Sequence, residues 1–274
     1  MFLKKKNIHC IIQCRLSSSR LPAKIFLPGP TKTLIEHLLE RLKKSKFLKK
    51  IIIATTNNSN DDFTYNFLRN ENDIFRGSEK NVLERYYNCA KKYKSEIIVR
   101  ITSDCPLMDY RLIDEMIEFF LKKDCDYLSN IHPPSLPDGF DIEIFTFKSL
   151  ETSYKNAKES FQKEHVTPYI WDQPNKFNIS NFSTNLKDKK LYEKYRLTLD
   201  YIEDYLVIFE IYNKLYKKNK FFSYIDIINV IKKNKNLTKK NNKLIKVNWY
   251  GLYLKKLKSI KLKDTKIISN YINK

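Results

Sequence analysis

The stretch IHCIIQCRLSSSRLPAK, residues 8–24, joins an apolar run to a loop that is rich in hydrogen-bond donors. The run 8–14 is apolar almost throughout, which predicts a strand covered on both faces of a parallel sheet. The loop that follows holds two arginines, three serines and a lysine, and it has no glycine. Because ligands of parallel sheets bind beyond the carboxyl ends of the strands, this loop is the first candidate for a binding site.

The rest of the chain repeats this order of strand, loop and helix. Amphipathic patterns predict helices at 31–45, 61–70, 79–93, 110–123, 147–160, 163–173 and 201–218, and apolar or alternating runs predict strands at 49–56, 73–78, 96–101, 125–130, 140–147, 176–182 and 195–200. Such alternation predicts an α/β fold with a doubly wound, mostly parallel sheet. We expect one main domain over 1–220 and a small, basic, helical C-terminal extension over 221–274.

The composition is typical of a globular protein. Hydrophobic residues make up 42% of the 274 residues, which is enough for a sizeable core and excludes general disorder. The longest apolar stretches are far shorter than the ~20 residues that a membrane span needs, and no signal-like core follows Met1. The five cysteines form no CxxC pair, so we expect reduced, mostly buried thiols in a cytoplasmic protein.

The positive charge is concentrated at one end of the chain. Of the formal net charge of +21, residues 211–274 contribute +16, from 18 lysines and two aspartates. Genome composition produces such Lys- and Asn-rich segments as easily as selection for a polyanion does, so we do not expect nucleic acid as a partner. One alternative function is kept open, a protein that binds polyanions or membrane surfaces through this basic tail.

The first loop has the composition of an anion-binding site. Arg15, Arg20 and Lys24 would surround a helix N-terminus with cations, and the serines at 17–19 add donors for phosphate oxygens. The loop is neither a Walker A motif nor a dinucleotide fingerprint, because GxxxxGK[ST] and GxGxxG are both absent. A triphosphate is the ligand that this many cations favour, and a solvated basic loop is the alternative.

Two aspartates are expected at the same edge of the sheet. Asp104 in VRITSDCPLMD and Asp200 in YRLTLDYIEDY both follow predicted strands and precede helices. Carboxylates that reach one crevice from separate strands are suited to Mg²⁺ and to metal-assisted nucleotidyl transfer. Alternatively, Asp200 is a helix N-cap. Arg100 either points toward the ligand or pairs with a neighbouring carboxylate.

Six motifs, in this order, resemble those of a known family. They are QCRLSSSRLPAK, FRGSEKNVLERYY, VRITSDCPLMD, PDGFDIEIF, EHVTPYI and RLTLDYIEDY, spread over about residues 8–210. The chain resembles the CMP-sugar synthetase-like cytidylyltransferases, and within them the spore-coat polysaccharide biosynthesis branch. The resemblance implies a nucleotidyltransferase fold of the GT-A-like, Rossmann-like kind and a homodimer. It also implies Mg²⁺-dependent transfer of CMP from CTP to an acidic or sugar-type acceptor, with release of pyrophosphate, in surface polysaccharide or glycoconjugate biosynthesis.

The resemblance also implies roles for individual residues. The CTP phosphates would be bound by Arg15, Ser19, Arg20 and Lys24, the metal by Asp104 and Asp200, and the base and ribose by Thr55, Arg76 and Gly77. Among these, Arg15, Lys24, Asp104 and Asp200 would be catalytic. The chain departs from the family pattern at Ser17 and Ala23, where relatives commonly have glycine.

The acceptor pocket is expected around residues 130–175. Asp141 and Glu143 alternate with apolar residues, so both carboxylates project from one face of a strand, toward the acceptor or toward solvent. His165 is a candidate for acceptor binding or acid–base work, with a helix-cap or core histidine as the alternative. A nucleotide-sugar glycosyltransferase is the alternative enzyme, with DCD at 124–126 as its metal motif, although this segment also fits a helix-end turn.

Overall fold

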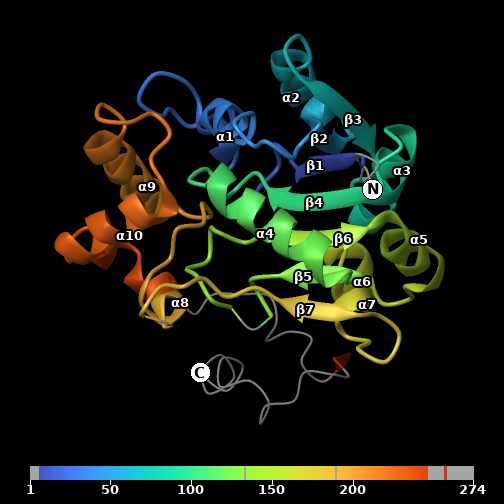
Figure 1. Cartoon of the computed structure of the whole chain (residues 1–274). Helices are drawn as coiled ribbons and strands as arrows, with labels where there is room; N and C mark the ends of the chain where they lie inside the picture. The colour runs from blue at the N-terminus through green and yellow to red at the C-terminus, as the bar shows by residue number, and fades with distance from the viewer. Residues whose placement is uncertain (1–5, 133, 189, 246–255, 258–274) are drawn as a thin grey trace.

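The computed structural model describes residues 6–132, 134–188, 190–245 and 256–257. Within these residues the chain forms a seven-stranded sheet in the order β3-β2-β1-β4-β6-β5-β7 (Figure 1). The strands are β1 (Ile8–Gln13), β2 (Lys50–Thr56), β3 (Asp73–Gly77), β4 (Ile97–Thr102), β5 (Tyr127–Ser129), β6 (Glu143–Thr146) and β7 (Ile179–Asn181). Only β6 runs antiparallel to its neighbours, so the sheet is mixed and mostly parallel, as the sequence predicted.

Helices cover both faces of this sheet. The helices are α1 (Leu34–Leu42), α2 (Asp62–Leu68), α3 (Val82–Lys92), α4 (Tyr110–Lys123), α5 (Phe147–Asn156), α6 (Ser160–His165), α7 (Pro168–Trp171), α8 (Leu191–Lys194), α9 (Ile202–Leu215) and α10 (Tyr224–Lys233). Successive residues of β1 point to opposite faces: Cys10 and Ile12 pack in one core cluster with α1, α4 and α9, whereas Ile11 packs in the other with α3 and α5. The doubly wound prediction is therefore confirmed.

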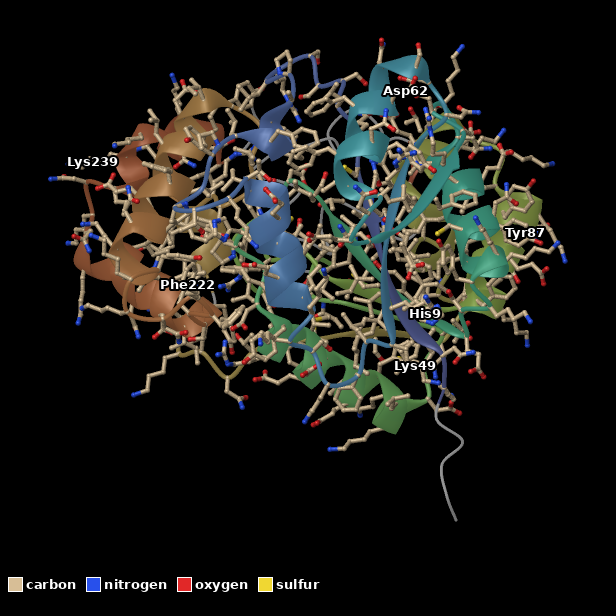
Figure 2. The ribbon with its side chains drawn as sticks, turned by 90° about the horizontal axis from the view of Figure 1, so that it is seen from above. His9, Lys49, Asp62, Tyr87, Phe222 and Lys239 are labelled. Atoms are coloured by element: carbon tan, nitrogen blue, oxygen red, sulfur yellow. The ribbon has the colours of Figure 1, made fainter. Side chains whose placement is uncertain are left out.

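The beginning of the C-terminal extension contributes to the core. Phe222, Tyr224 and Ile227 are buried in the same cluster as α1, α4 and α9. Arg41 of α1 is 2% exposed, donates to the main-chain oxygens of Met108 (2.8 Å) and Phe222 (2.7 Å), and lies over the Phe222 ring. Figure 2 shows Phe222 between the C-terminal helices and α1, whereas Lys239 lies on the outer edge.

Two predicted elements differ from the observed ones. Residues 195–200 do not form a strand; they are extended and hold only a single bridge between Arg196 and Asp138. The predicted helix at 163–173 is divided into α6 and α7, because Val166 has a positive φ of 72° and Pro168 starts a new helix.

The cysteine prediction is confirmed, since the described structure contains five free, buried thiols. No helix among the described residues is long and apolar enough to cross a membrane.

Removing the Arg41 side chain should weaken the whole fold. In Arg41→Ala, two buried carbonyls lose their charged donor, so we expect the free energy of unfolding to fall by about 2–4 kcal/mol. Urea unfolding measures this change. The control is Lys43→Ala, on the exposed side of the same helix end, which should stay within about 0.5 kcal/mol of the wild type. Equal effects of the two substitutions would contradict the role given to Arg41.

Candidate active site

The candidate site lies where the strand order reverses. From β1 the chain proceeds to β2 and β3 on one side, and β4 lies on the other side of β1. The loops after β1 and β4 therefore diverge at the carboxyl edge, which is where a ligand crevice is expected in an open α/β sheet. The segment before α9 joins the loop after β4, because Leu199 N donates to the main-chain oxygen of Asp104 at 2.8 Å. This bond brings Asp200 next to Asp104, as the sequence predicted.

Lys24 connects the two aspartates. Its Nζ lies 3.3 Å from Asp104 Oδ2 and 2.8 Å from Asp200 Oδ1, and Arg20 Nη2 lies 2.6 Å from the same Asp200 oxygen. Burial by itself would lower the pKa of Lys24, but the two carboxylates outweigh it and raise that pKa. Lys24 and Arg20 thus together offset the charge of two carboxylates that arrive from distant parts of the chain.

Arg196 holds the other side of Asp200, and sequence reasoning missed it. This arginine is 1% exposed and donates to Asp138 (3.0 Å), Asp200 (2.9 Å) and Asp204 (3.1 Å). Burial favours the neutral acid of Asp200, but Lys24, Arg20 and Arg196 together lower its pKa. The signal in the sequence was the spacing of Arg196 from Asp200 and Asp204, four and eight residues later. It was overlooked because residues 195–200 were predicted to form a strand.

Asp200 is not the N-cap of α9. The N-cap is Tyr201, and the capping carboxylate belongs to Asp204, which accepts hydrogen bonds from the backbone N–H groups of Asp200 (3.0 Å) and Tyr201 (3.1 Å). The Asp200 side chain is therefore free of helix capping and points to the cations in the crevice.

The first loop is closed at its base and open at its tip. Ala23 N donates to Leu16 O at 3.1 Å, and Leu16 N donates to the buried Asp61 at 2.6 Å. The loop's predicted phosphate ligands Arg15, Ser19 and Arg20 are exposed. Ala23 adopts a left-handed conformation with φ 54°, which explains why glycine is typical at this position.

Arg85 is a further cation near the first loop that sequence reasoning missed. It is 1% exposed and donates to Ser78 O at 2.7 Å. Burial lowers the pKa of Arg85, and the positive charge of Arg15 acts in the same direction. Arg85 thus adds a buried positive charge near the first loop.

The residues expected at the base and ribose have structural contacts of their own. Arg76 donates to Thr56 O (2.8 Å) and Asn58 O (2.9 Å) and pairs with Asp62 at 2.7 Å. A side chain at Gly77 would lie 3.0 Å from Cγ of Arg85, so this glycine makes room for the buried arginine. Thr55 is fully buried and its hydroxyl has no partner among the described residues. Contact of these three residues with a nucleotide stays a prediction.

Arg100 pairs with a carboxylate, which was one of its two expected positions. Its guanidinium donates to Glu143 and to Gln13 Oε1 (3.1 Å). Glu143 is 2% exposed and also accepts from Tyr127 (2.6 Å) and Thr167 (2.5 Å). Although burial works in the other direction, Arg100 and these hydroxyls lower the pKa of Glu143. Glu143 is therefore a buried, ionised group with three hydrogen-bond donors around it.

The remaining acceptor candidates lie near Glu143. Burial lowers the pKa of His165 to about 3, with Arg100 acting in the same direction and Glu143 opposing it. The imidazole is therefore neutral at pH 7. Burial and the nearby carboxylate of Asp138 raise the pKa of Asp141 well above its ordinary value. Binding of an acceptor by Asp141, Glu143 and His165 stays a prediction.

The donor set at Asp104 and Asp200 fits a hard divalent cation. No group of three or more metal-binding side chains occurs in the described parts of the chain. Mg²⁺, however, commonly uses one or two carboxylates and takes its other ligands from water and substrate phosphates. Two carboxylates that already share a cation, beside a loop suited to phosphates, match this pattern.

The DCD segment lies away from this crevice. Asp124 is exposed and ends α4 in a left-handed conformation with φ 47°. Asp126 accepts from Asn178 N at 3.0 Å, just before β5 begins. Because β5 runs parallel to β4, DCD lies at the amino edge of the sheet, opposite Asp104. It is the helix-end turn that the sequence also allowed.

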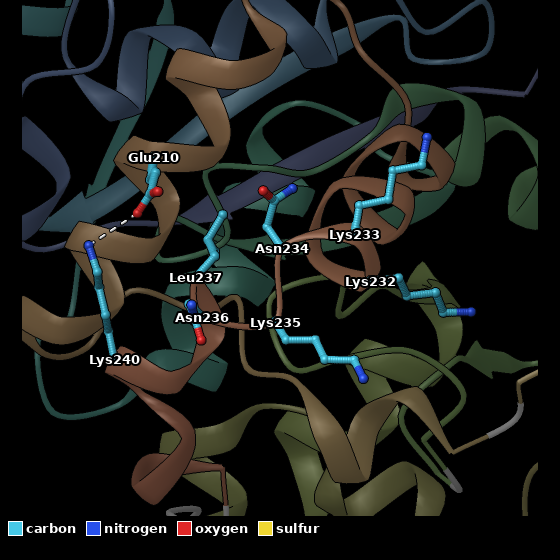
Figure 3. A pocket seen from close by; sticks show the side chains of 8 residues that line it. All are labelled: Glu210, Lys232, Lys233, Asn234, Lys235, Asn236, Leu237 and Lys240. Carbon is cyan, nitrogen blue, oxygen red and sulfur yellow. Dashed lines mark hydrogen bonds and ion pairs between the residues drawn. The ribbon is translucent and has the colours of Figure 1, made fainter.

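A second hollow lies on the extension (Figure 3). It has a volume of about 500 Å³ and is lined by Glu210, Leu237, Asn234, Asn236 and the four lysines 232, 233, 235 and 240. One of these lysines, Lys240, pairs with Glu210 of α9 at 3.1 Å. These four lysines therefore lie apart from Asp104 and Asp200.

Comparison with known proteins identifies the family of this chain. Residues 9–246 match the family model described as cytidylyltransferase. Over 221 residues the chain is 43% identical to an uncharacterized protein of Methanocaldococcus jannaschii, a match that covers 80% of this chain and 85% of the relative. Over 214 residues it is 32% identical to the spore coat polysaccharide biosynthesis protein SpsF of Bacillus subtilis, covering 76% and 87%.

A solved structure has the same fold. The structure of a cytidylyltransferase from Leptospira borgpetersenii superposes with a TM-score of 0.79 at 37% sequence identity. The superposition covers 85% of this chain and 97% of that one. The similarity thus extends over nearly the whole of the solved protein.

Relief of the backbone strain at Ala23 should stabilise the protein. An L-residue in the left-handed region costs about 1 kcal/mol, whereas glycine adopts it freely. We expect Ala23→Gly to raise the free energy of unfolding by about 0.5–1 kcal/mol. The control Ala157→Gly, at φ −67°, should lower it instead. A loss of stability in Ala23→Gly, measured by urea unfolding, would refute this account.

Acid should weaken the fold partly through His165. In the folded state this imidazole accepts a proton only near pH 3, whereas in an unfolded chain it does so near 6.5. Between these values the unfolded state binds more protons, so the free energy of unfolding falls as the pH falls. From pH 7 to 5 we expect His165→Gln to lose about 1–2 kcal/mol less than the wild type, as measured by urea unfolding at both values. Lys163→Gln, on the same helix, should follow the wild type, and identical losses in all three proteins would contradict the prediction.

Proposed function

The chain belongs to the cytidylyltransferase family, and from this premise we propose that it transfers CMP from CTP to an acidic or sugar-type acceptor and releases pyrophosphate. The observation that carries the proposal is the junction of Lys24 with Asp104 and Asp200 at the end of the donor-rich loop. A bound triphosphate needs cationic side chains for its phosphate oxygens and carboxylates for the divalent cation that accompanies it. Both kinds of side chain lie at this edge of the sheet.

The cations of the first loop would bind the phosphates. Arg15 is exposed just before the closed base of the loop, and Ser19 and Arg20 are exposed within the loop. Lys24 is fixed at the base of the loop, and its side chain is 12% exposed. With one fixed lysine and two long, exposed arginine side chains, the loop could contact several phosphate oxygens at once.

Asp104 and Asp200 would hold Mg²⁺. When bound, the ion would supply positive charge to the phosphate oxygens of CTP. The position of such an ion would be set by the chain's own residues. Arg196 fixes one oxygen of Asp200, and the Leu199–Asp104 backbone bond fixes the distance between the segments that carry Asp104 and Asp200.

In the proposed reaction an acceptor oxygen attacks the α-phosphorus of CTP in line. The bond from this phosphorus to the bridging oxygen of pyrophosphate breaks, and pyrophosphate departs with the electron pair. Lys24 and Arg15 would offset the charge that develops on the leaving group. Position and electrostatics supply the rate in such transfers, so no nucleophile of the protein is required.

The acceptor side is less defined than the nucleotide side. Its candidate residues are Asp141, Glu143 and His165. The ion pair between Glu143 and Arg100 would hold the buried base of this pocket in a fixed position. Similarity to SpsF supports a product used in surface polysaccharide or glycoconjugate biosynthesis. A homodimer and a cytoplasmic location stay predictions, as does a separate role for residues 221–274.

Replacing Asp104 should abolish turnover in a protein that still folds. We expect Asp104→Asn to lower kcat/KM at least about 10³-fold, equivalent to about 4 kcal/mol, because a carboxylate of the metal-binding pair is lost. Pyrophosphate release measures activity, and thermal unfolding measures binding. CTP with Mg²⁺ at ~100 times its Kd should add about 2.7 kcal/mol of stability to the wild type and less to the variant.

The matched control is Asp124→Asn in the DCD segment. The residue is exposed and asparagine tolerates its left-handed backbone, so activity should be unchanged. Loss of activity in this variant, together with stabilisation by nucleotide sugars rather than CTP, would favour the glycosyltransferase. An Asp104→Asn protein with wild-type activity would overturn the proposed function.

A further inference from the structure

The short segment that follows α10 contacts the residues that hold Asp200 in place. It comprises η3 (Thr238–Lys240), Asn241 and η4 (Asn242–Leu244). Asn241 is 1% exposed, and its Nδ2 donates to Asp204 Oδ1 at 2.8 Å and to the main-chain oxygen of Arg196 at 3.0 Å. Both partners belong to the group of side chains that holds Asp200.

The orientation of the Asn241 amide follows from chemistry. Both neighbouring groups are acceptors, so only the NH₂ end can face them. The carbonyl end is left without a partner among the described residues, at a free-energy cost. The two hydrogen bonds that the NH₂ group donates are therefore the polar contacts by which this buried amide acts on its surroundings.

The hydrogen bond to Asp204 stabilises a fully buried carboxylate. Asp204 is 0% exposed, and besides Asn241 it accepts from Arg196 Nε and from the backbone N–H of Asp200. A buried carboxylate depends on every donor around it. Without the hydrogen bond from Asn241, the Asp204 carboxylate would be held less firmly in the orientation in which it accepts from both Arg196 and the backbone N–H of Asp200.

Two exposed ion pairs flank this contact. Lys240 pairs with Glu210 (Figure 3) and Lys243 with Glu203, so the segment touches α9 on both sides of Asn241. Exposed pairs contribute little free energy, up to about 1 kcal/mol each. Asn241 is thus the buried polar link between the C-terminal extension and the crevice.

We propose that Asn241 is a positioning residue for the metal-binding Asp200, acting through Asp204 and Arg196. The proposal rests on the proposed function. It gives the described part of the extension a role in catalysis that does not depend on its positive charge. Partners that orient metal ligands typically change metal affinity or activity 10–100-fold when they are replaced.

The test compares Asn241→Asp with Asn242→Asp. The first places a carboxylate against two acceptors without a change in size, and the second makes the same chemical change at the exposed neighbouring position. We expect Asn241→Asp to raise the Mg²⁺ concentration for half-maximal pyrophosphate release, or to lower kcat/KM, by 10–100-fold. It should also lose the part of CTP-dependent thermal stabilisation that EDTA removes from the wild type. Asn242→Asp should match the wild type in all three measurements.

A second variant guards against misfolding. If Asn241→Asp does not give a folded protein, Asn241→Ala removes the donor without adding charge, and the same Mg²⁺ titrations apply. A folded position-241 variant with the Mg²⁺ dependence of Asn242→Asp would overturn the inference alone. A wild-type protein that shows no Mg²⁺-dependent response to CTP would refute the proposed function, and this inference with it.

Discussion

The candidate active site depends on keeping two like charges together. Asp104 follows β4 and Asp200 precedes α9, so their carboxylates come from segments far apart in the sequence. Repulsion between them is offset on one side by Lys24 and on the other by Arg196, and the Leu199–Asp104 backbone bond fixes their separation. Each of these contacts joins a different part of the chain, so the site forms only when the whole domain has folded.

The fold contains several other buried charged residues. Arg41, Arg85, Arg196, Glu143 and Asp204 are all almost completely buried. An unpaired buried charge is strongly destabilising, so each has specific hydrogen-bond partners. Several of these partners are main-chain carbonyls of the loops around the crevice, and these contacts fix the loops that carry the candidate ligands.

The sequence predicted much of the site because its chemistry is local. A parallel sheet places loops at one edge, and the residue types within a loop are visible without a structure. The two aspartates predicted at one edge of the sheet do lie together there, since both pair with Lys24. Arg85, Asp138 and Asp204 were missed, because burial and partners of a charged residue depend on elements that are distant in the sequence. The predicted strand at 195–200 was wrong because Leu197 and Leu199 bury their side chains in the core while their N–H groups donate to the loop carbonyls of Asp138 and Asp104 and not to a neighbouring strand.

By itself the sequence determined the doubly wound fold, the carboxyl-edge crevice and the family, since periodicity and motif order are properties of the chain alone. The tertiary structure decided which cations hold which carboxylates, that Arg100 pairs with Glu143, and that DCD lies at the opposite edge. It also decided that the basic extension contributes Asn241 to the support of Asp200. Composition marked that segment only as positive and polar. A hydrogen bond across 37 residues depends on where two segments meet, and only packing determines that meeting point.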